Sequence, residues 1–475
     1  DYDASLISKG GGIWDRASKD IPLPLEVREW LGIRHESLDG QTLIRHLLGA
    51  EADLLWNGGI GTYVKSSSES NEDAGDRAND PVRIDAGQLK VKVVGEGGNL
   101  GMTQLARIEY ALAGGMVNTD AIDNSGGVDC SDHEVNLKIL MGQLIEAGQV
   151  ASMDERDNIL LDITEEVNSD VLANNYSQSL CLTLDLLRCQ VNIDPFITLS
   201  DRLGRAGLLD RRSEFLPSTR EIQTRRLVKP ELAILLAYSK MHLYQVLLES
   251  DLPEASIANE FLLGYFPNAV RERFGNELAH HPLAREIIST VMTNRIVDQA
   301  GCSFILNMVD QTGAMPDKLA RIYLVLDLAT GADRLRRAIF SLDNRMPADL
   351  QHGLLLRLEG NLNYLVVDFS EAGEIPELSR ESIDLIREKV EHFDQSLSSV
   401  LPEEEMQGIL AESDELVAFG MDEKDARDFA ILDKYKNFLP VDQLTEQTGK
   451  DLFSVFRTYL DVREYLEYDE LTRAF

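Results

Sequence analysis

The sequence has few cysteines and no long apolar run, and each shortage argues against a class of protein. Its 475 residues include four cysteines, Cys130, Cys181, Cys189 and Cys302, and none has the C-x-x-C spacing. This argues against a disulfide framework and a zinc knuckle, and it favours a reducing cytoplasm as the compartment. Cys181 and Cys189 lie eight apart on a helical pattern and are interpreted as packed thiols. No run of about eighteen apolar residues occurs, so no membrane-spanning segment is expected.

Basic residues are also scarce. The 46 lysines and arginines stand against 81 aspartates and glutamates, which gives a net charge of −35. A surface of this charge repels phosphate backbones, so nucleic acid is not expected as a partner. The hydrophobic content of 44% and the length predict an ordinary folded protein with two or three domains.

Glycine, in contrast, is concentrated at one end of the chain. Nineteen of the 34 glycines lie at or before Gly127. The same region contains three strand-like runs, at Asp53–Trp56, Lys90–Val94 and Met116–Ile122. Between the second and third runs, residues 103–113 have apolar positions at helical spacing (Leu105, Ile108, Ala111 and Leu112), followed by Gly114 as the expected C′ residue. The order strand, glycine turn, helix, strand predicts a βαβ unit with a parallel sheet.

After about Lys138 the pattern becomes helical. Apolar residues recur at i, i+3, i+4 and i+7 in five long segments, at 163–188, 229–250, 282–301, 318–342 and 381–401. We therefore predict an α/β domain at residues 1–138 followed by an all-α domain at 139–475, with a possible subdivision near 373. The polar stretch Ser66–Pro81 interrupts the α/β pattern. It is interpreted as a solvated surface loop, with a lid over a nucleotide site as the alternative.

Three clusters of glycine and asparagine follow strand-like runs. They are Asn57, Gly58, Gly59 and Gly61; Glu96, Gly97, Gly98 and Asn99; and Asn124, Gly126 and Gly127 with Ser131. Each cluster alone is typical of a turn. Three at successive strand ends favour a binding site, because the carboxyl ends of parallel strands meet at one edge. An amide side chain both donates and accepts, which suits a carboxamide ligand such as nicotinamide.

The glycines of VVGEGGNLG do not have the spacing of a phosphate-binding fingerprint. Gly95 and Gly97 stand two apart, but Leu100 occupies the third position and Gly101 comes one residue late. We interpret this stretch as a later strand end of a nucleotide domain. Further along, Ser131 to Glu134 spells S-x-x-E, which predicts a capping box that opens the next helix.

Other charged clusters give weaker signals. Asp132, His133 and Glu134 are consecutive, so on a helix they diverge, and no metal site is expected. The basic stretch Arg211–Arg226 suits either an anionic effector or packing against the acidic remainder, and we favour packing.

Two of the glycine–asparagine clusters resemble motifs of the glutamate dehydrogenase family. In that family an E-G-A-N segment precedes a helix, a strand and A-N-A-G-G-V-x-x-S-x-x-E. Glu96, Gly97 and Asn99 match the first motif, with Gly98 in place of alanine, whereas the family's G-P-T-T is replaced by residues 100–103. The second motif is matched by Asn124, Gly126, Gly127, Val128, Ser131 and Glu134. The long loop and the helical extension are similar to those of the very long bacterial NAD-specific enzymes.

The resemblance implies a partial Rossmann-like NAD-binding domain at 1–138. It implies oxidative deamination of L-glutamate to 2-oxoglutarate and ammonia, with hydride transfer to NAD, by a cytoplasmic homo-oligomer. The implied cofactor-binding residues are Asn57, Gly58, Gly59, Gly97, Gly98, Asn99 and Asn124, and the implied substrate-binding residue is Ser131.

The family's catalytic lysine and aspartate and its glycine fingerprint are expected upstream of Asp1, so no catalytic residue is named here. The isolated chain is expected to be inactive. The residue that selects NAD over NADP is expected in the same upstream stretch, so the choice of cofactor rests on the resemblance alone. Two alternatives stay open: a helical region for assembly or allosteric control, and another amino-acid dehydrogenase.

Overall fold

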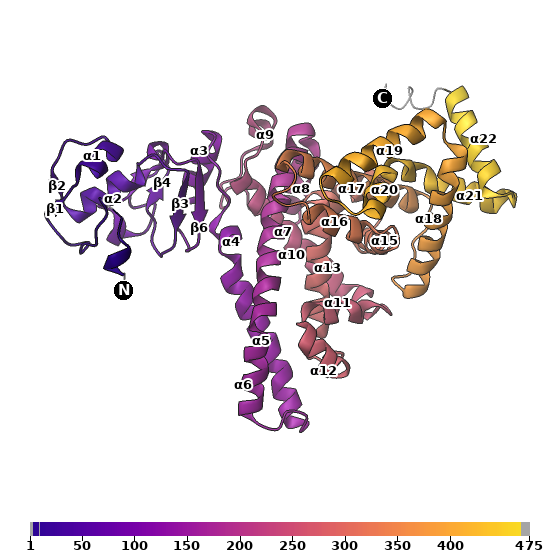
Figure 1. Cartoon of the computed structure of the whole chain (residues 1–475), viewed down its shortest axis with the longest axis horizontal. Coiled ribbons are helices and arrows are strands. Elements are labelled where there is room, and N and C mark those ends of the chain that lie inside the picture. Colours follow the sequence, from indigo (N-terminus) through magenta and orange to yellow (C-terminus); the bar gives the residue numbers. More distant parts are fainter. Residues whose placement is uncertain (1–2, 9, 467–475) are drawn as a thin grey trace. The chain divides into compact units, whose positions relative to one another are not determined.

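The structure is a computed structural model that describes residues 3–8 and 10–466. The chain divides into two compact units. The first comprises residues 1–239 with 267–269, and the second comprises residues 240–266 with 270–475. The expected domain boundaries at 138 and 373 stay predictions. As expected, a mixed α/β region comes first and helices follow (Figure 1).

The α/β region of the first unit consists of short strands, helices and 3-10 turns. Its elements are η1 (Ala4–Leu6), β1 (Ile21–Pro22), α1 (Leu25–Leu31), β2 (Ser37–Leu38), α2 (Gly40–Leu48), β3 (Leu54–Asn57), β4 (Val64–Lys65), η2 (Arg77–Asn79), β5 (Ile84–Asp85), η3 (Ala86–Gln88), β6 (Val93–Glu96), α3 (Gln104–Leu112) and α4 (Asp120–Asp123). Strands β3 and β6 are parallel, and so are β4 and β5, whereas β1 and β2 are antiparallel.

The parallel pair β3–β6 is the element that positions the site. Its register places Leu54 opposite Val93 and Asn57 opposite Glu96, so the carboxyl ends of both strands lie at one edge. The predicted third strand at Met116–Ile122 is wrong. A single parallel bridge joins Val93 to Met116, and the chain then enters α4.

Helix α3 covers one face of this sheet. Thr103 caps it by accepting the amide of Ala106, and Gly114 follows it with φ +97°, which confirms the predicted C′ residue. The buried face differs from the predicted one: Leu112 is exposed, whereas Tyr110 is buried and donates from its hydroxyl to the carbonyl of Val91 at 2.7 Å. The core under α3 consists of Val64, Ile84, Ala86, Val91, Val94, Met102, Ala106, Tyr110 and Val117.

Helices of 7 to 28 residues complete the first unit. They are α5 (Ser125–Glu146), α6 (Met153–Asp162), α7 (Thr164–Val191), α8 (Asp194–Arg205), α9 (Thr219–Arg225) and the first half of α10 (Lys229–Glu249). Helix α5 runs beside α7 (Figure 1), where Asn174 Nδ2 donates to Asp129 Oδ2 at 2.9 Å. Cys181 and Cys189 are buried on α7, as predicted.

The second unit is helical throughout its described part. Its elements after α10 are η4 (Leu252–Glu254), α11 (Ala258–Tyr265), α12 (Asn268–Leu278), α13 (Ala284–Ala300), α14 (Phe304–Thr312), α15 (Pro316–Ala329), α16 (Ala332–Phe340), α17 (Ala348–Glu371), α18 (Arg380–Val400), α19 (Glu403–Ala418), α20 (Glu423–Ala430), η5 (Leu432–Asn437), α21 (Phe438–Thr448) and α22 (Leu452–Tyr465). The segment predicted at 318–342 is two helices, because the chain breaks at Gly331, whose φ is +73°. No helix in the described part of the chain has both the length and the apolar character that crossing a membrane requires.

Candidate functional site

The turns that follow β3 and β6 lie against each other. The amide of Gly98 donates to the carbonyl of Asn57 at 2.9 Å. A Cβ atom at Gly98 would lie 2.6 Å from the carbonyl oxygen of Gly59, and one at Gly101 would lie 1.7 Å from Nδ2 of Asn57. Glycine is therefore required at position 98, where the clash is with backbone, whereas at position 101 the Asn57 amide would have to move. The structure thus brings the first and second predicted clusters together.

The irregular glycine spacing in β6 has a packing reason. The indole of Trp56 lies over the strand, so that a Cβ at Gly95 would be 2.8 Å from its ring and one at Gly97 would be 2.3 Å away. Trp56 remains 61% exposed. Gly95 and Gly97 therefore make room for an aromatic side chain, which agrees with the failure of the phosphate fingerprint. That Gly97 also contacts a cofactor stays a prediction.

The third cluster joins the other two through its asparagine. Asn124 follows α4, and its Nδ2 donates to Oδ1 of Asn99 in the turn after β6. The two residues are 25 positions apart in the sequence. Asn57 and Asn99 thus lie at one edge of the small sheet, as the positions of their strand ends predicted, and Asn124 reaches this edge from a helix and not from the predicted third strand.

Ser131 is placed differently from what its motif predicted. Helix α5 already begins at Ser125, so Ser131 lies in its second turn and does not cap it. The Ser131 hydroxyl donates to the carbonyl of Gly127 at 3.2 Å, while Glu134 pairs with Lys138. The predicted capping box is therefore wrong, because the turn at Asn124 starts the helix earlier. Ser131 is exposed, and its role in binding a substrate carboxylate stays a prediction.

A buried ion pair joins the end of strand β6 to helix α3. Glu96 ends β6 with a fully buried side chain, and the guanidinium of Arg107 on α3 contacts it at 2.6 and 3.0 Å. The amide of Met102 also donates to Glu96 Oε1 at 3.0 Å. Burial raises the pKa of Glu96, and Arg107 opposes this shift. A buried bidentate pair of this kind fixes both side chains, because losing one partner leaves the other charge uncompensated.

Two aspartates of α4 extend this pair toward the turns. Asp120 contacts Arg107 Nη2 at 3.1 Å, and Asp123 Oδ2 accepts the amide of Glu96 at 3.0 Å. Burial raises the pKa of Asp123, although the hydrogen bonds from Glu96 and Asn118 oppose that shift. Lys229 at the start of α10 donates to Thr183 Oγ1 at 2.8 Å, and burial lowers its pKa despite the attraction of Asp123.

Sequence reasoning missed this charged network. Glu96 belonged to a quoted motif, but nothing in the sequence identified Arg107 as its partner. The available signal was a basic residue one helical turn before Ala111, one of the apolar positions of the predicted helix. Arg107 lies between Ala106 and Ile108, which are both buried. A charge that must be buried in a helix face requires a buried counter-charge nearby.

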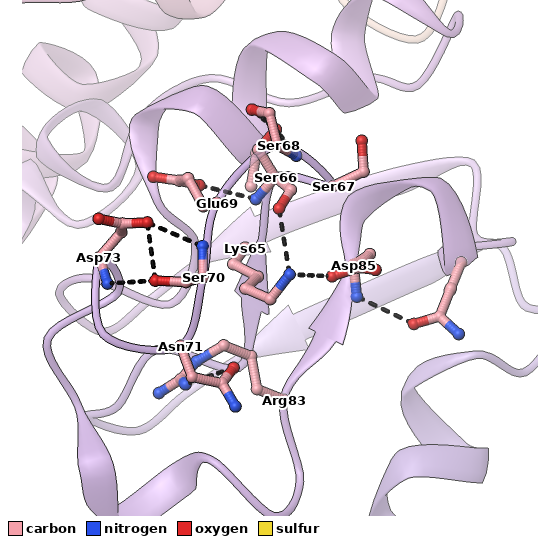
Figure 2. A network of polar contacts seen from close by, with 12 residues as sticks. Lys65, Ser66, Ser67, Ser68, Glu69, Ser70, Asn71, Asp73, Arg83 and Asp85 are labelled. Atoms are coloured by element: carbon pink, nitrogen blue, oxygen red, sulfur yellow. Dashed lines mark hydrogen bonds and ion pairs between the residues drawn. The ribbon is translucent and has the colours of Figure 1, made fainter.

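The Ser66–Pro81 loop is tied to α3 by several hydrogen bonds. Glu109 accepts from the Ser66 hydroxyl at 2.6 Å and from the Ser67 amide at 2.7 Å. Figure 2 shows polar contacts around the loop: Lys65 on β4 pairs with Asp85 on β5, and the guanidinium of Arg83 donates to Asn71 Oδ1 in the loop at 3.1 Å. Most of its residues are exposed, which confirms the predicted surface loop. These contacts give no support to a freely moving lid.

The remaining candidates have ordinary structural partners. His133 is buried whereas Asp132 and Glu134 are exposed, so the three side chains diverge. No group of three or more residues suited to a metal ion occurs in residues 3–8 and 10–466. Arg211 pairs with Asp201 at 2.6 Å, and Arg225 pairs with Glu231. Two of the five arginines in the stretch at 211–226 therefore pair with acidic neighbours, as favoured, and Arg212, Arg220 and Arg226 are exposed.

Comparison with known proteins agrees with the motifs. A family model described as bacterial NAD-glutamate dehydrogenase, catalytic domain, matches residues 1–185, and one described as glutamate dehydrogenase, C-terminal, matches residues 224–475. Three relatives are named NAD-specific glutamate dehydrogenase. That of Halomonas elongata is 38% identical over 472 residues, which are 98% of this chain and 29% of the relative. Those of Pseudomonas aeruginosa and Mycobacterium tuberculosis are each 44% identical, over 360 and 351 residues respectively.

These last two alignments cover 75% and 71% of this chain but 22% of each relative. The chain thus spans between 22% and 29% of the length of the relatives it matches. The two family models together account for most of its residues, and one of them alone covers more than half. The chain belongs to the bacterial NAD-glutamate dehydrogenase family.

Proposed function

We propose that this chain is part of an NAD-dependent glutamate dehydrogenase, which oxidatively deaminates L-glutamate to 2-oxoglutarate and ammonia. Residues 1–138 would then be part of a Rossmann-like NAD-binding domain, supported by the parallel pair β3–β6 with helix α3 packed against it. The parent enzyme would work as a homo-oligomer in the cytoplasm, and the low cysteine content without C-x-x-C spacing supports a reducing compartment.

The observation that carries the proposal is the Asn99–Asn124 amide pair. One hydrogen bond joins Asn124 Nδ2 to Asn99 Oδ1. In the described part of the chain, no other hydrogen bond engages Nδ2 of Asn99 or Oδ1 of Asn124. The pair therefore leaves the Nδ2 group of Asn99 as a donor and Oδ1 of Asn124 as an acceptor. A carboxamide is the complementary ligand, since it accepts through its oxygen and donates through its nitrogen.

The surroundings of the pair fit a nicotinamide nucleotide. Gly58, Gly59 and Gly98 expose backbone at the same sheet edge, and the edge at the carboxyl ends of parallel strands is where such ligands bind. Asn99 and Asn124 would orient the carboxamide, while Asn57 and its glycines would line the path of the rest of the cofactor. When bound, NAD would supply the hydride acceptor, and the protein would supply orientation.

Ser131 is the proposed contact for the side-chain carboxylate of glutamate. It lies on α5 two turns beyond Asn124, on an exposed face. Its hydroxyl now donates to the Gly127 carbonyl, a bond that it would have to exchange for the carboxylate. The lysine and aspartate that the resemblance implies for proton transfer have no matching position in this sequence, so that step is not assigned to any residue here.

Steady-state kinetics of the intact enzyme test the proposal. Reduction of NAD by L-glutamate is expected, and Asn99→Ala should raise the KM for NAD because one of two amide partners is lost. Ser131→Ala should raise the KM for glutamate, with a transition-state cost of about 1–3 kcal/mol. Leucine and valine have no side-chain carboxylate, so neither should become a better substrate. Failure of the intact enzyme to oxidise glutamate would refute the proposal.

A further inference from the structure

The turn that carries Asn99 contains a leucine in an uncommon backbone conformation. Leu100 has φ +59°, in the left-handed region that is unfavourable for residues with a Cβ atom. Its side chain is 63% exposed, so packing does not explain why the turn keeps this conformation. A polar contact does: the amide of Leu100 donates to Oδ2 of Asp120 at 2.8 Å.

The carboxylate of Asp120 is itself held in place. Its Oδ1 accepts the amide of Ala121 at 2.9 Å and contacts Arg107 Nη2 at 3.1 Å. Arg107 is 5% exposed and is fixed by its two contacts with the buried Glu96. Charge-assisted contacts of this kind are stronger than neutral ones, and a buried donor is costly to leave unpaired. A chain of contacts therefore runs from Glu96 at the end of β6 through Arg107 on α3 and Asp120 on α4 to the Leu100 amide.

The other asparagine of the pair is fixed from the opposite end of α4. Asp123 accepts the amide of Glu96 at 3.0 Å and Nδ2 of Asn118 at 2.8 Å. Asn175 on α7 donates to the carbonyl of Ile122 at 2.8 Å. Helix α4 is thus anchored before Asn124 begins the turn into α5. Within the described part of the chain, Asp120 is the only residue of α4 whose side chain bonds to the turn at residues 97–101.

We propose that Asp120 is a positioning residue: held by Arg107, it fixes the left-handed turn at Leu100 and so places the Asn99 amide against Asn124. This inference rests on the proposed function, because it assumes that the Asn99–Asn124 pair receives the nicotinamide carboxamide. Asp120 acts through Asn99 and does not itself contact the cofactor. Its removal therefore changes how well the pair is aligned, without removing a binding group.

Two measurements on the intact enzyme test the inference. Hydrogen exchange followed by mass spectrometry reports the protection of the Leu100 amide, and kinetics report the KM for NAD. Asp120→Ala should accelerate exchange in peptides that contain Leu100 and raise the KM for NAD about ten-fold, with a smaller change in the KM for glutamate. Asp120→Asn keeps an oxygen acceptor but loses the charge, so it should recover part of both effects.

Asp53→Ala is the matched control. Asp53 also forms an ion pair, with Lys92 at 2.7 Å, but the side chains of both residues are largely exposed. Pairs of that kind contribute little, so neither the exchange at Leu100 nor the KM for NAD should change.

The outcomes separate failure of the inference from failure of the proposed function. Unchanged exchange at Leu100 in Asp120→Ala would overturn the inference. Faster exchange with an unchanged KM for NAD, while Asn99→Ala raises that KM, would also overturn it but would leave the proposed function standing. An unchanged KM for NAD in both variants would overturn the role of the Asn99–Asn124 pair, and the inference with it.

Discussion

At the residue scale, the contact between the two glycine turns gives a direct test of the site geometry. A methyl group at Gly98 would meet the Gly59 backbone at 2.6 Å, so the two turns must separate. We expect Gly98→Ala to lower the free energy of unfolding by about 1–3 kcal/mol, the usual cost when added volume forces a backbone shift. Urea denaturation measures this.

Gly142→Ala is the control for that substitution. Gly142 lies within α5, and a Cβ there meets nothing within 4 Å. Alanine should therefore stabilise the helix by roughly 0.5–1 kcal/mol. If Gly98→Ala were as stable as Gly142→Ala, the close approach of the two turns would be wrong.

The second residue-scale prediction concerns a buried aspartate in the second unit. Burial raises the pKa of Asp394 on α18 to about 7; Asp428 and Glu391 add to the shift, whereas the Tyr435 hydroxyl, which donates at 3.1 Å, opposes it. The folded state therefore holds the proton more tightly than the unfolded chain does. Protonated Asp394 contributes its full stabilisation at pH values below 3.8, the ordinary pKa of an aspartate. That contribution is lost as the pH rises through about 7.

Asp394→Asn should therefore stabilise the protein at pH values of about 8, by roughly 1–4 kcal/mol, and the gain should shrink toward about pH 4. Asp433→Asn is the contrasting variant. Hydrogen bonds from Asn361 and Arg357 outweigh burial and lower the pKa of Asp433, so its neutralisation should destabilise the protein at the higher pH. Urea denaturation of both variants across this pH range tests the prediction. A lower free energy of unfolding for Asp394→Asn at high pH would contradict it.

Sequence reasoning predicted some residues of the site and not others, for a physical reason. That Asn57 and Asn99 lie at one edge was predictable, because parallel strands bring their carboxyl ends together whatever the surrounding charges, whereas Asn124 follows α4 and not a strand. The Glu96–Arg107–Asp120 chain was not, because the pairing of charges depends on which helix face is buried. The predicted face of α3 included Leu112, which is exposed, and left out Arg107.

At the element scale, four of the predicted long helices, the parallel pair β3–β6 and helix α3 were predictable, whereas the third predicted strand was not. The periodic patterns at 163–188, 229–250, 282–301 and 381–401 correspond to α7, α10, α13 and α18. The predicted strand at Met116–Ile122 instead bends into α4 after one bridge. There, the carboxylates of Asp120 and Asp123 accept hydrogen bonds from backbone amides of the neighbouring turn and strand. No local sequence pattern indicates these contacts.

The Ser66–Pro81 loop supports an element-scale prediction. Hydrogen bonds from Ser66 and Ser67 lower the pKa of Glu109 although partial burial opposes the shift, so the carboxylate form holds the loop. Glu109→Gln should weaken these bonds, with an expected cost of about 1 kcal/mol because the site is partly exposed. Hydrogen exchange should become faster at residues 66–68.

The same contact predicts an acid response of the loop. A lowered carboxyl pKa contributes stability that is present above the ordinary value of 4.5 and lost as the pH falls through the lower, folded value. Exchange at residues 66–68, corrected for the intrinsic pH dependence of amide exchange, should therefore lose protection at acid pH in the wild type but not in Glu109→Gln. Protection that is unchanged by the substitution would show that other contacts hold the loop.

At the scale of the whole molecule, charge imbalance is the property that composition alone establishes. The chain carries 81 acidic and 46 basic residues, and many of the basic ones are already used in ion pairs such as Arg336 with Asp327 and Glu359. The excess of acidic over basic residues leaves a net charge of −35, and this like charge repels itself, which disfavours the compact state. The distribution of this repulsion between the two compact units depends on their folds, so composition alone does not reveal it.

Screening this repulsion should stabilise the protein. The Debye length falls from about 30 Å at about 0.01 M salt to about 10 Å at about 0.1 M, so repulsion between distant surface carboxylates weakens first. Buried pairs such as Glu96 with Arg107 lie at 2.6 Å and are screened much less. We expect the Tm of the 475-residue chain to rise by several degrees between about 0.01 M and about 0.3 M sodium chloride. Differential scanning calorimetry with potassium chloride as the second salt checks that the effect is ionic. A Tm that falls with salt would mean that exposed ion pairs outweigh the surplus of 35 negative charges.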